Sequence, residues 1–261
     1  MRAESGDSMG KALAGKPFDA AAQMDSLREQ LEEQRRIAEE KEHQLQLYAA
    51  DLRDTFVAER ARAEELRASY VATVRALTNA VEARDAYTGK HAERVAAYGL
   101  ELTRRIDSHL AADPETEFGF LLHDVGKVAI PDGVLYKTTD LGDEEQSLMR
   151  RHPVIGYEIV QGIEFLSDAA MIVRHHHERW DGQGYPDGLA GEEIPLAARI
   201  FAVADALDAM TTDRPYRPGF SIERAREEIR SGAGTQFDPA VVEQLGALPD
   251  EAIERIRAEI G

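Results

Sequence analysis

The stretch Phe120-Leu-Leu-His-Asp-Val-Gly-Lys-Val-Ala-Ile-Pro131 decides the fold of this 261-residue chain. An apolar run leads directly into the neighbouring side chains of His123 and Asp124, and Lys127 follows three residues later. Imidazole nitrogens and carboxylate oxygens suit first-row transition metals, and one carboxylate can bridge two ions about 3.5–4 Å apart. A single His-Asp pair is more often the polar end of a core helix, so the rest of the chain must decide between these two interpretations.

The composition excludes several classes of protein. A net charge of −18 argues against a broad nucleic-acid interface, which needs clustered Lys and Arg. The absence of Cys excludes disulfides, thiolate catalysis and cysteine-based zinc sites. The first residues lack the apolar core of a signal peptide, and no run of about 18 apolar residues could span a bilayer. We therefore expect a cytoplasmic protein with no membrane insertion and no nucleic-acid polymer as a partner.

The N-terminal third is predicted to be a tail followed by a long helix. Residues 1–24 lack periodicity and are predicted to be disordered. Residues 25–82 contain no Gly or Pro, are rich in helix formers, and carry apolar side chains at alternating three- and four-residue spacing, which is typical of a coiled coil. A small domain cannot cover so long an apolar stripe, so we expect a homodimer through residues 25–82. The alternative is a single helix whose last turns pack on the domain.

The remainder of the chain is predicted to be all-α, because no segment alternates in the way that strands do. The main domain is predicted to span residues 83–240, and residues 241–261 to form a C-terminal helical extension packed on it. Capping residues predict helix starts at Asp113-Pro114, Asp143, Ser221 and Asp238-Pro239.

The densest group of metal-binding side chains is His175-His176-His177, which precedes the Gly-rich segment Asp181–Gly191. Consecutive helical residues point about 100° apart, so two neighbouring imidazoles can reach one metal cluster while the third points away. The Gly-rich segment is predicted to form a loop beside that cluster. His91 opens a predicted helix and His152 precedes Pro153, and taken alone each is more often a polar surface residue.

One aspartate stands out in the apolar helix predicted from Pro195 to Met210. A buried and unpaired carboxylate is costly, so Asp205 is predicted to be paired, protonated or bound to metal, and the histidines elsewhere favour metal. Asp208, one turn later, is predicted to support the ligands from behind. Arg214 and Arg217 follow, and their guanidinium groups suit phosphate contacts, although surface ion pairing is the simpler interpretation.

Together these motifs resemble the HD-GYP family of metal-dependent cyclic-di-GMP phosphodiesterases, within the HD hydrolase superfamily. The resemblance covers roughly residues 83–240. It is carried by His123-Asp124 with Gly126-Lys127, His176-His177-Glu178 through Gly184-Tyr-Pro186, Asp85-x-Tyr-Thr, Ile194-Pro-Leu, Asp213-Arg-Pro-Tyr and Gly234-Thr-Gln-Phe-Asp-Pro239. It implies an HD-type helical domain with a metal centre, in which Asp124 bridges and the ligands are His91, His123, Asp124, His152, His176, His177 and Asp205.

The resemblance also implies two divalent transition-metal ions, with iron or manganese favoured. Family members with a third metal carry a Glu four residues before the first His, and Tyr87 stands at that position here. Asp124 and Lys127 would be catalytic: a hydroxide bridging the two ions would attack phosphorus, while Lys127 stabilises the phosphoryl oxygens or protonates the leaving oxygen. Tyr185, Arg214 and Arg217 would join Lys127 in contacting the substrate.

The resemblance predicts hydrolysis of cyclic-di-GMP to pGpG and leaves open whether the reaction continues to GMP. One alternative is an HD hydrolase that acts on another nucleotide or cyclic dinucleotide. A second is a non-catalytic dimeric module that senses the cyclic dinucleotide or docks a diguanylate cyclase. Relatives often carry a sensory domain upstream and this sequence has none, so a sensory protein is a further candidate partner or the chain is an excerpt of a longer one.

Overall fold

The structure, a computed structural model, describes residues 20–84, 90–213 and 218–260. These residues form helices and loops, with two isolated β-bridges, Asp181–Ala190 and Ala233–Phe237, and no strand. The all-α prediction is therefore confirmed. No helix in the described ranges combines the length and the apolar character needed to cross a bilayer. The chain divides into two units, residues 1–66 and 67–261, and each is described by itself.

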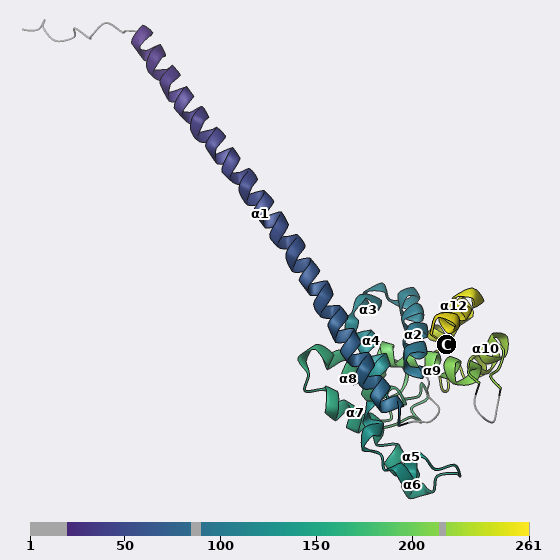
Figure 1. Cartoon of the computed structure of the whole chain (residues 1–261). Coiled ribbons are helices and arrows are strands. Elements are labelled where there is room, and N and C mark those ends of the chain that lie inside the picture. The colour runs from purple at the N-terminus through teal and green to yellow at the C-terminus, as the bar shows by residue number, and fades with distance from the viewer. Residues whose placement is uncertain (1–19, 85–89, 214–217, 261) are drawn as a thin grey trace, which may run out of the picture. The chain divides into compact units, whose positions relative to one another are not determined.

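The helices are drawn in Figure 1. Their bounds are α1 (Ala20–Glu82), α2 (His91–Ile106), α3 (Ser108–Ala112), α4 (Pro114–Leu122), η1 (Val125–Ala129), α5 (Asp132–Leu135), α6 (Asp143–Met149), α7 (His152–Val160), η2 (Glu164–Leu166), α8 (Ser167–His175), η3 (Gly191–Glu193), α9 (Leu196–Thr211), α10 (Ile222–Ser231), α11 (Pro239–Gly246) and α12 (Asp250–Ile260).

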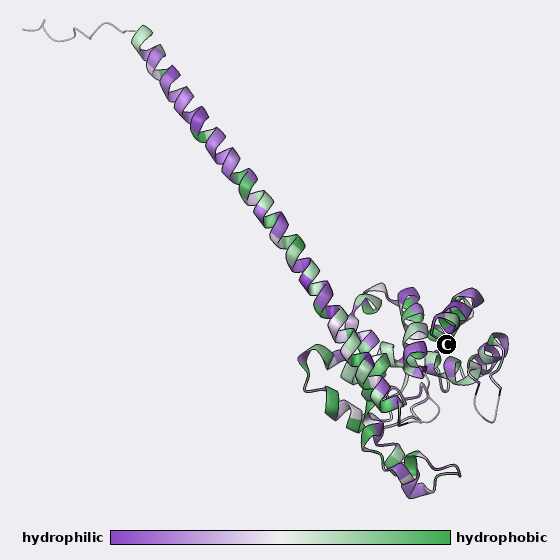
Figure 2. Ribbon diagram, viewed as in Figure 1, coloured by the Kyte–Doolittle hydropathy of each residue, from purple (hydrophilic) through white to green (hydrophobic). Residues whose placement is uncertain are grey.

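The first unit contains most of α1, so the predicted long helix is confirmed. Residues 20–24, predicted to belong to the tail, form its first turn. The apolar side chains are exposed, with Leu31 70% and Leu52 71% exposed. Figure 2 shows them as separate hydrophobic positions on a largely hydrophilic helix. An apolar stripe of this length has no cover within its own unit, and the homodimer that would cover it stays a prediction.

The second unit is built around four helices, α2, α4, α8 and α9. Helix α4 packs on α2 and α8, and α2 packs on α9. Their contact is filled by large side chains that are almost completely buried, including Phe118, Phe120, Ile200 and Phe201. Burial of each such side chain contributes roughly 1.5–3 kcal/mol. This core fixes the ends of α4 and α8, where the polar motifs begin.

Capping residues set most of the helix starts as predicted. Asp113 accepts a hydrogen bond from Glu115 N at 2.9 Å, and Asp238 accepts one from Ala240 N at 2.8 Å. The prediction for Asp143 is wrong, because Asp143 is the first residue of α6 and Gly142 precedes it as the cap position. The Glu145 side chain accepts a hydrogen bond from Gly142 N at 2.8 Å, so the contact at this helix start comes from the third residue of the helix.

Candidate metal centre

Asp124 lies at the centre of the candidate site, directly after the end of α4. Its Oδ1 is 3.2 Å from His152 Nε2 and 4.0 Å from His176 Nε2. Its Oδ2 is 3.1 Å from His123 Nε2 and 2.8 Å from Lys127 Nζ. The two oxygens of one carboxylate therefore face two different sets of side chains. Burial opposes ionisation, but His123 and Lys127 outweigh it and hold the pKa of Asp124 well below its ordinary value.

Three imidazoles are oriented by backbone carbonyl groups. The Nδ1 atoms of His123, His152 and His176 lie 2.9, 2.7 and 2.7 Å from carbonyl oxygens three residues earlier. A carbonyl only accepts, so each Nδ1 carries the proton and donates it. This leaves the Nε2 atom of each ring on the side of Asp124, which is the orientation that a metal-binding histidine needs.

The spacing of two of these rings fits a shared cation. His152 Nε2 and His176 Nε2 are 3.2 Å apart, and with His177 their ligand atoms all lie within 4.8 Å of one another. Two lone pairs facing each other at that distance repel unless a positive charge lies between them. Two nitrogens that bind one ion at about 2.0–2.1 Å are expected about 2.9–3.4 Å apart. These three histidines could therefore hold a divalent metal ion.

Burial favours the neutral rings of His176 and His177. Desolvation and the neighbouring His177 and His152 place the pKa of His176 well below its ordinary value. Desolvation, with a contribution from His152, lowers the pKa of His177 to about 4. His175 turns away from the group, and its Nε2 lies 3.0 Å from Asp187 Oδ2. The structure thus brings together two of the three consecutive histidines, as the helical geometry predicts.

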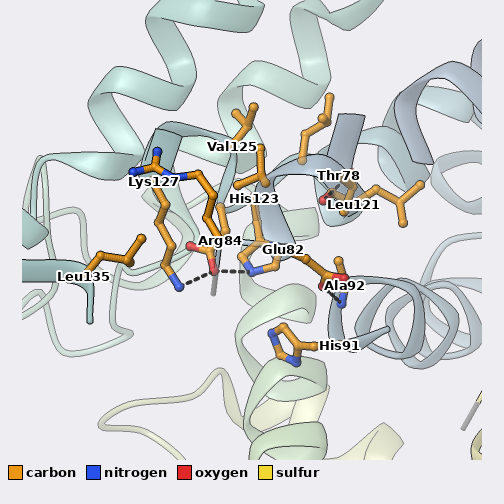
Figure 3. A pocket seen from close by; sticks show the side chains of 13 residues that line it. Thr78, Glu82, Arg84, His91, Ala92, Leu121, His123, Val125, Lys127 and Leu135 are labelled. Carbon is orange, nitrogen blue, oxygen red and sulfur yellow. Dashed lines mark hydrogen bonds and ion pairs between the residues drawn. The ribbon is translucent and has the colours of Figure 1, made fainter. Parts of the chain in front are cut away.

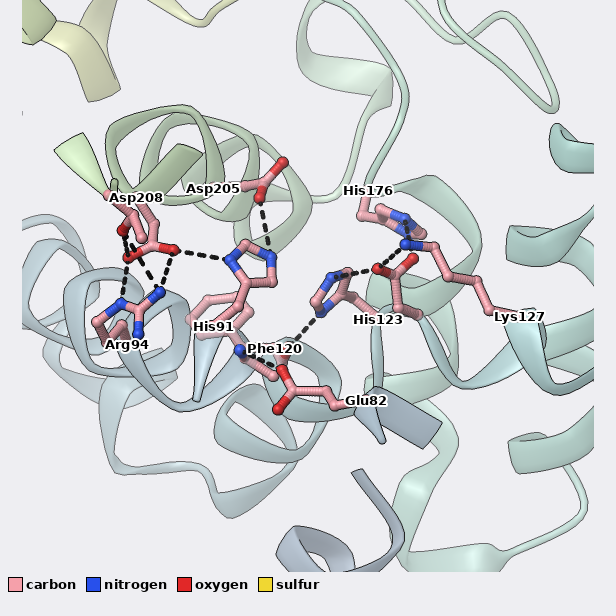
Figure 4. A network of polar contacts seen from close by, with 12 residues as sticks. Glu82, His91, Arg94, Phe120, His123, Lys127, His176, Asp205 and Asp208 are labelled. Carbon is pink, nitrogen blue, oxygen red and sulfur yellow. Dashed lines mark hydrogen bonds and ion pairs between the residues drawn. The ribbon is translucent and has the colours of Figure 1, made fainter. Parts of the chain in front are cut away.

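His91 and Asp205 form a second group near His123, whose ring centroid is 5.6 Å from that of His91 (Figure 4). His91 Nε2 is 3.3 Å from Asp205 Oδ1, and its Nδ1 is 2.8 Å from Asp208 Oδ2. Arg94 donates two hydrogen bonds to Asp208, from Nε to Oδ1 at 2.7 Å and from Nη2 to Oδ2 at 3.0 Å. Burial disfavours the charged ring, but the two carboxylates outweigh burial and raise the pKa of His91 to about 10.

The expectation that Asp205 is buried in the core needs correction. Its side chain is 36% exposed, whereas that of Asp208 is 2% exposed. Asp205 lies on the one uncovered face of α9, so hydration already reduces the cost of its charge. The buried carboxylate in this helix is Asp208. Its charge is compensated by His91 and Arg94, as a buried carboxylate requires.

Two cavities adjoin the candidate centre. The cavity in Figure 3 has a volume of about 20 Å³ and is lined by His91, His123, Asp124, Lys127 and, at the end of α1, Glu82. This volume holds little more than a water molecule. The other cavity is about 340 Å³ and lies between α9 and the segment that follows α8, with His176, His177 and Asp205 in its wall. Only the larger of these two has room for a nucleotide.

The Gly-Tyr-Pro loop packs against the centre. The ring of Tyr185 stacks on His177, with centroids 4.7 Å apart and planes 26° apart. The guanidinium of Arg150 lies 5.3 Å from the centroid of the Tyr185 ring. Glu178 Oε1 anchors the loop by accepting hydrogen bonds from the backbone N of Asp187 and Gly188. Three residues named from the sequence lie outside the described residues: Tyr87, Arg214 and Arg217.

Two residues of the site, Arg94 and Glu82, were not predicted from the sequence. Arg94 stands one turn after His91 on α2. The signal that could have indicated it is its charge on the buried, mainly apolar face of this helix. Glu82 accepts a hydrogen bond from Ala92 N at 2.8 Å and so joins the end of α1 to the first turn of α2. Burial raises its pKa. Its pattern in the sequence is that of any helix surface, so nothing there indicated this position.

Comparison with known proteins identifies the family of this chain. A family model described as an HD domain matches residues 75–241. The chain is 41% identical over 175 residues to the cyclic di-GMP phosphodiesterase response regulator RpfG of Xanthomonas campestris pv. campestris, covering 66% of this chain and 46% of that protein. It is 40% identical over 203 residues to 3'3'-cGAMP-specific phosphodiesterase 2 of Vibrio cholerae, covering 75% and 38%. It spans less than half the length of both relatives.

A solved structure supports the fold. The crystal structure of the V. cholerae cyclic GMP-AMP specific phosphodiesterase V-cGAP3 superimposes with a TM-score of 0.52 at 22% sequence identity, and the match covers 70% of this chain and 53% of that one. A likeness at this identity concerns the fold alone. The family model covers well over half of the chain, and two curated cyclic di-GMP phosphodiesterases are 41% and 38% identical to it, so the chain belongs to the HD-domain family, as one of its HD-GYP members.

Proposed function

We propose that this chain is a metal-dependent phosphodiesterase that hydrolyses cyclic di-GMP to pGpG. The observation that carries the proposal is the position of Asp124, whose two carboxylate oxygens face separate groups of nitrogen and oxygen donors. Two-metal hydrolytic sites use a carboxylate in this position. The names of the relatives, which include cyclic di-GMP phosphodiesterases, support the choice of substrate.

The donor set supports two divalent transition-metal ions, with Asp124 shared between them. Mixed imidazole and carboxylate donors suit iron and manganese, which we propose as the resident metals. The proposed ligands are His91, His123, Asp124, His152, His176, His177 and Asp205. Ions held there would supply Lewis-acid chemistry, by activating water and by withdrawing charge from the phosphoryl oxygens.

Lys127 is the proposed catalytic partner of this centre. Its ammonium lies 2.8 Å from Asp124 Oδ2, which places a positive charge beside the reacting phosphate. In the reaction the water oxygen bonds to phosphorus, the bond from phosphorus to the 3′ oxygen breaks, and that oxygen takes up a proton. Lys127 either stabilises the phosphoryl oxygens or supplies this proton. We also propose that Tyr185, Arg214 and Arg217 contact the substrate.

A second candidate substrate is 3'3'-cGAMP, because one relative at 40% identity is named as specific for it. Both substrates contain the same kind of phosphodiester, so the metal centre alone does not choose between them. A receptor that binds a cyclic dinucleotide without cleaving it is the alternative from another class. Such a receptor has no need of a carboxylate held between two groups of metal donors.

The test is turnover by manganese- or iron-loaded protein with each dinucleotide, with the products identified by mass spectrometry. Wild type is expected to form pGpG, and His123→Ala and Asp124→Asn to abolish product formation. His109→Ala is the matched control, because His109 is an exposed histidine on α3. Tight binding of cyclic di-GMP without any product in the loaded wild type would favour the receptor and reject the enzyme.

A further inference from the structure

The larger cavity beside the candidate centre is built on the one uncovered face of α9. The other sides of this helix are buried and carry side chains such as Phe201, Val203 and Leu207. The face that lines the cavity of about 340 Å³ consists of Ala202, Asp205, Ala206, Ala209 and Met210. Three of these side chains are single methyl groups, so the helix forms a shallow apolar floor. A cavity of this size and lining is typical of small-molecule sites.

Two polar side chains close the cavity from loops that are joined to each other. Arg179 stands two residues after the candidate ligand His177, and Gln236 lies in the loop before α11. Both side chains line the cavity. The backbones of these loops are linked, since Trp180 N donates to Gln236 O at 3.3 Å and Asp181 N donates to Thr235 O at 2.8 Å. The linked loops therefore bring both side chains into the lining of the same cavity as the three alanines of α9.

The guanidinium of Arg179 is held in a fixed orientation before any ligand arrives. Its Nε and Nη2 donate to the two carboxylate oxygens of Asp181 at 3.1 and 2.7 Å. Asp181 is itself fixed, because it accepts a hydrogen bond from Gln183 N at 3.0 Å. These bonds use Nε and one N–H of Nη2. The other edge of the guanidinium, formed by Nη1 and the second N–H of Nη2, carries the donors that remain on this side chain of the cavity lining.

Resting on the proposed function, we propose that this cavity is a nucleobase subsite in which Arg179 selects guanine. Guanine presents two acceptors, O6 and N7, on one edge, and arginine donates to both. Adenine presents an amino group in place of O6, so two donors would face each other and one would lose its partner. The base face lies on the alanine floor, and Met210 adapts to it. Gln236 offers both a donor and an acceptor, so it binds either purine without choosing.

The test measures base preference apart from the chemistry. Bis(4-nitrophenyl) phosphate is hydrolysed as the reporter, and GMP and AMP are added as competing inhibitors. GMP is expected to inhibit the wild type at least about tenfold more strongly than AMP, since a good bidentate contact contributes about 1–3 kcal/mol of discrimination. Arg179→Met is expected to bring the two inhibition constants together. The same variant is expected to lower kcat/KM for cyclic di-GMP about 10–100-fold relative to the reporter.

Arg174→Met is the matched control. Arg174 also binds an aspartate with two nitrogens, Asp187 at 2.7 Å from each, but it does not line the cavity. It is expected to leave the ratio of GMP to AMP inhibition as in wild type, even if it alters turnover. Ala206→Leu fills the floor, and is expected to weaken cyclic di-GMP relative to the reporter. The proposal is overturned if Arg179→Met keeps the preference for GMP over AMP, or if Arg174→Met loses that preference to the same extent. It is also overturned if Ala206→Leu leaves kcat/KM for cyclic di-GMP unchanged relative to the reporter.

Failure of this proposal is distinct from failure of the proposed function. If the metal-loaded wild type hydrolyses neither the reporter nor cyclic di-GMP, the proposed function fails. Calorimetric titration of GMP and AMP into the manganese-loaded wild type and into Arg179→Met then decides the subsite. Tighter binding of GMP that is lost in Arg179→Met supports the subsite, and equal binding of the two nucleotides rejects it.

Discussion

His91 differs from the other oriented histidines in what holds its ring. His123, His152 and His176 donate to backbone carbonyls three residues earlier in the chain. His91 instead depends on the side chain of Asp208, which Arg94 holds in turn. A ring held by side chains can lose its orientation through one substitution that leaves the helices in place.

Asp208→Asn is therefore expected to weaken metal binding. Partners of this kind typically contribute about 10–100-fold to metal affinity. Chelator competition followed by elemental analysis measures the affinity, and circular dichroism checks that the helices remain. Asp187→Asn is the control, because Asp187 pairs with an arginine and a histidine in the same way but away from the candidate ligands. Wild-type affinity in Asp208→Asn would show that His91 needs no such support.

Lys127→Ala is expected to lower turnover while the metal content stays near that of wild type. Lys127 pairs with Asp124 Oδ2, but its ammonium cannot bind a metal, so its loss removes a positive charge beside the phosphate and no donor. Steady-state kinetics and elemental analysis of the same samples provide the measurement. Lys137→Ala is the control, since Lys137 forms a surface pair with Glu145. A parallel loss of metal in Lys127→Ala would make this lysine structural.

The metal-free protein is expected to lose stability as the pH falls from about 6.5 to 4. The pKa of His177 is lowered to about 4 in the folded state, whereas an ordinary histidine has a pKa of 6.5. Between these values the unfolded chain binds more protons than the folded one, so the free energy of unfolding rises with pH in this window. The contribution is at most about 3 kcal/mol. Urea unfolding at several pH values measures it, and a slope that His177→Gln does not reduce would contradict the assignment.

At the scale of the element, one close contact sets the distance between two candidate ligands. Gly126 in η1 lies against the start of α7, where a Cβ built on it would be 2.0 Å from His152 O and 2.6 Å from Gly156 N. Both partners are backbone atoms, so neither can turn aside. The close approach brings Asp124, two residues before Gly126, within 3.2 Å of His152.

Gly126→Ala is accordingly expected to destabilise the fold by at least about 2 kcal/mol, because overpacking forces the backbone to move. It is also expected to reduce metal content, since Asp124 and His152 separate. Gly133→Ala in α5 is the matched control, as a Cβ there meets nothing within 4 Å. Thermal unfolding and elemental analysis compare the two variants. Equal stability of both would mean that η1 and α7 can shift without consequence.

The elements themselves were largely predictable, because each has a local signal. Asp113-Pro114 and Asp238-Pro239 mark helix starts by capping, and the lack of Gly and Pro predicts α1. What the sequence could not provide was the direction of each side chain. Asp205 and Asp208 lie one turn apart in the same apolar helix, and only the packing of α9 shows that Asp208 is the buried one. Arg179 and Gln236 lie far apart in the chain and meet only through the linked loops.

At the scale of the whole molecule, residues 20–66, the described part of the first unit, form no core of their own. Their exposed apolar positions recur along α1 for many turns, and a second copy of the same helix would cover them. Removal of residues 1–60 is expected to weaken dimerisation more than metal binding. Light scattering and elemental analysis of the truncated and full-length proteins compare these effects. A full-length protein that is monomeric would reject the coiled coil.

The end of α1 is tied directly to the helix that delivers His123. Thr78 Oγ1 donates to Leu121 O at 3.1 Å, and Thr78 is buried. Leu121 stands two residues before His123, with no flexible loop between them. A rotation or axial shift of these last turns of α1 is therefore expected to move the end of α4, which is followed at once by His123 and Asp124.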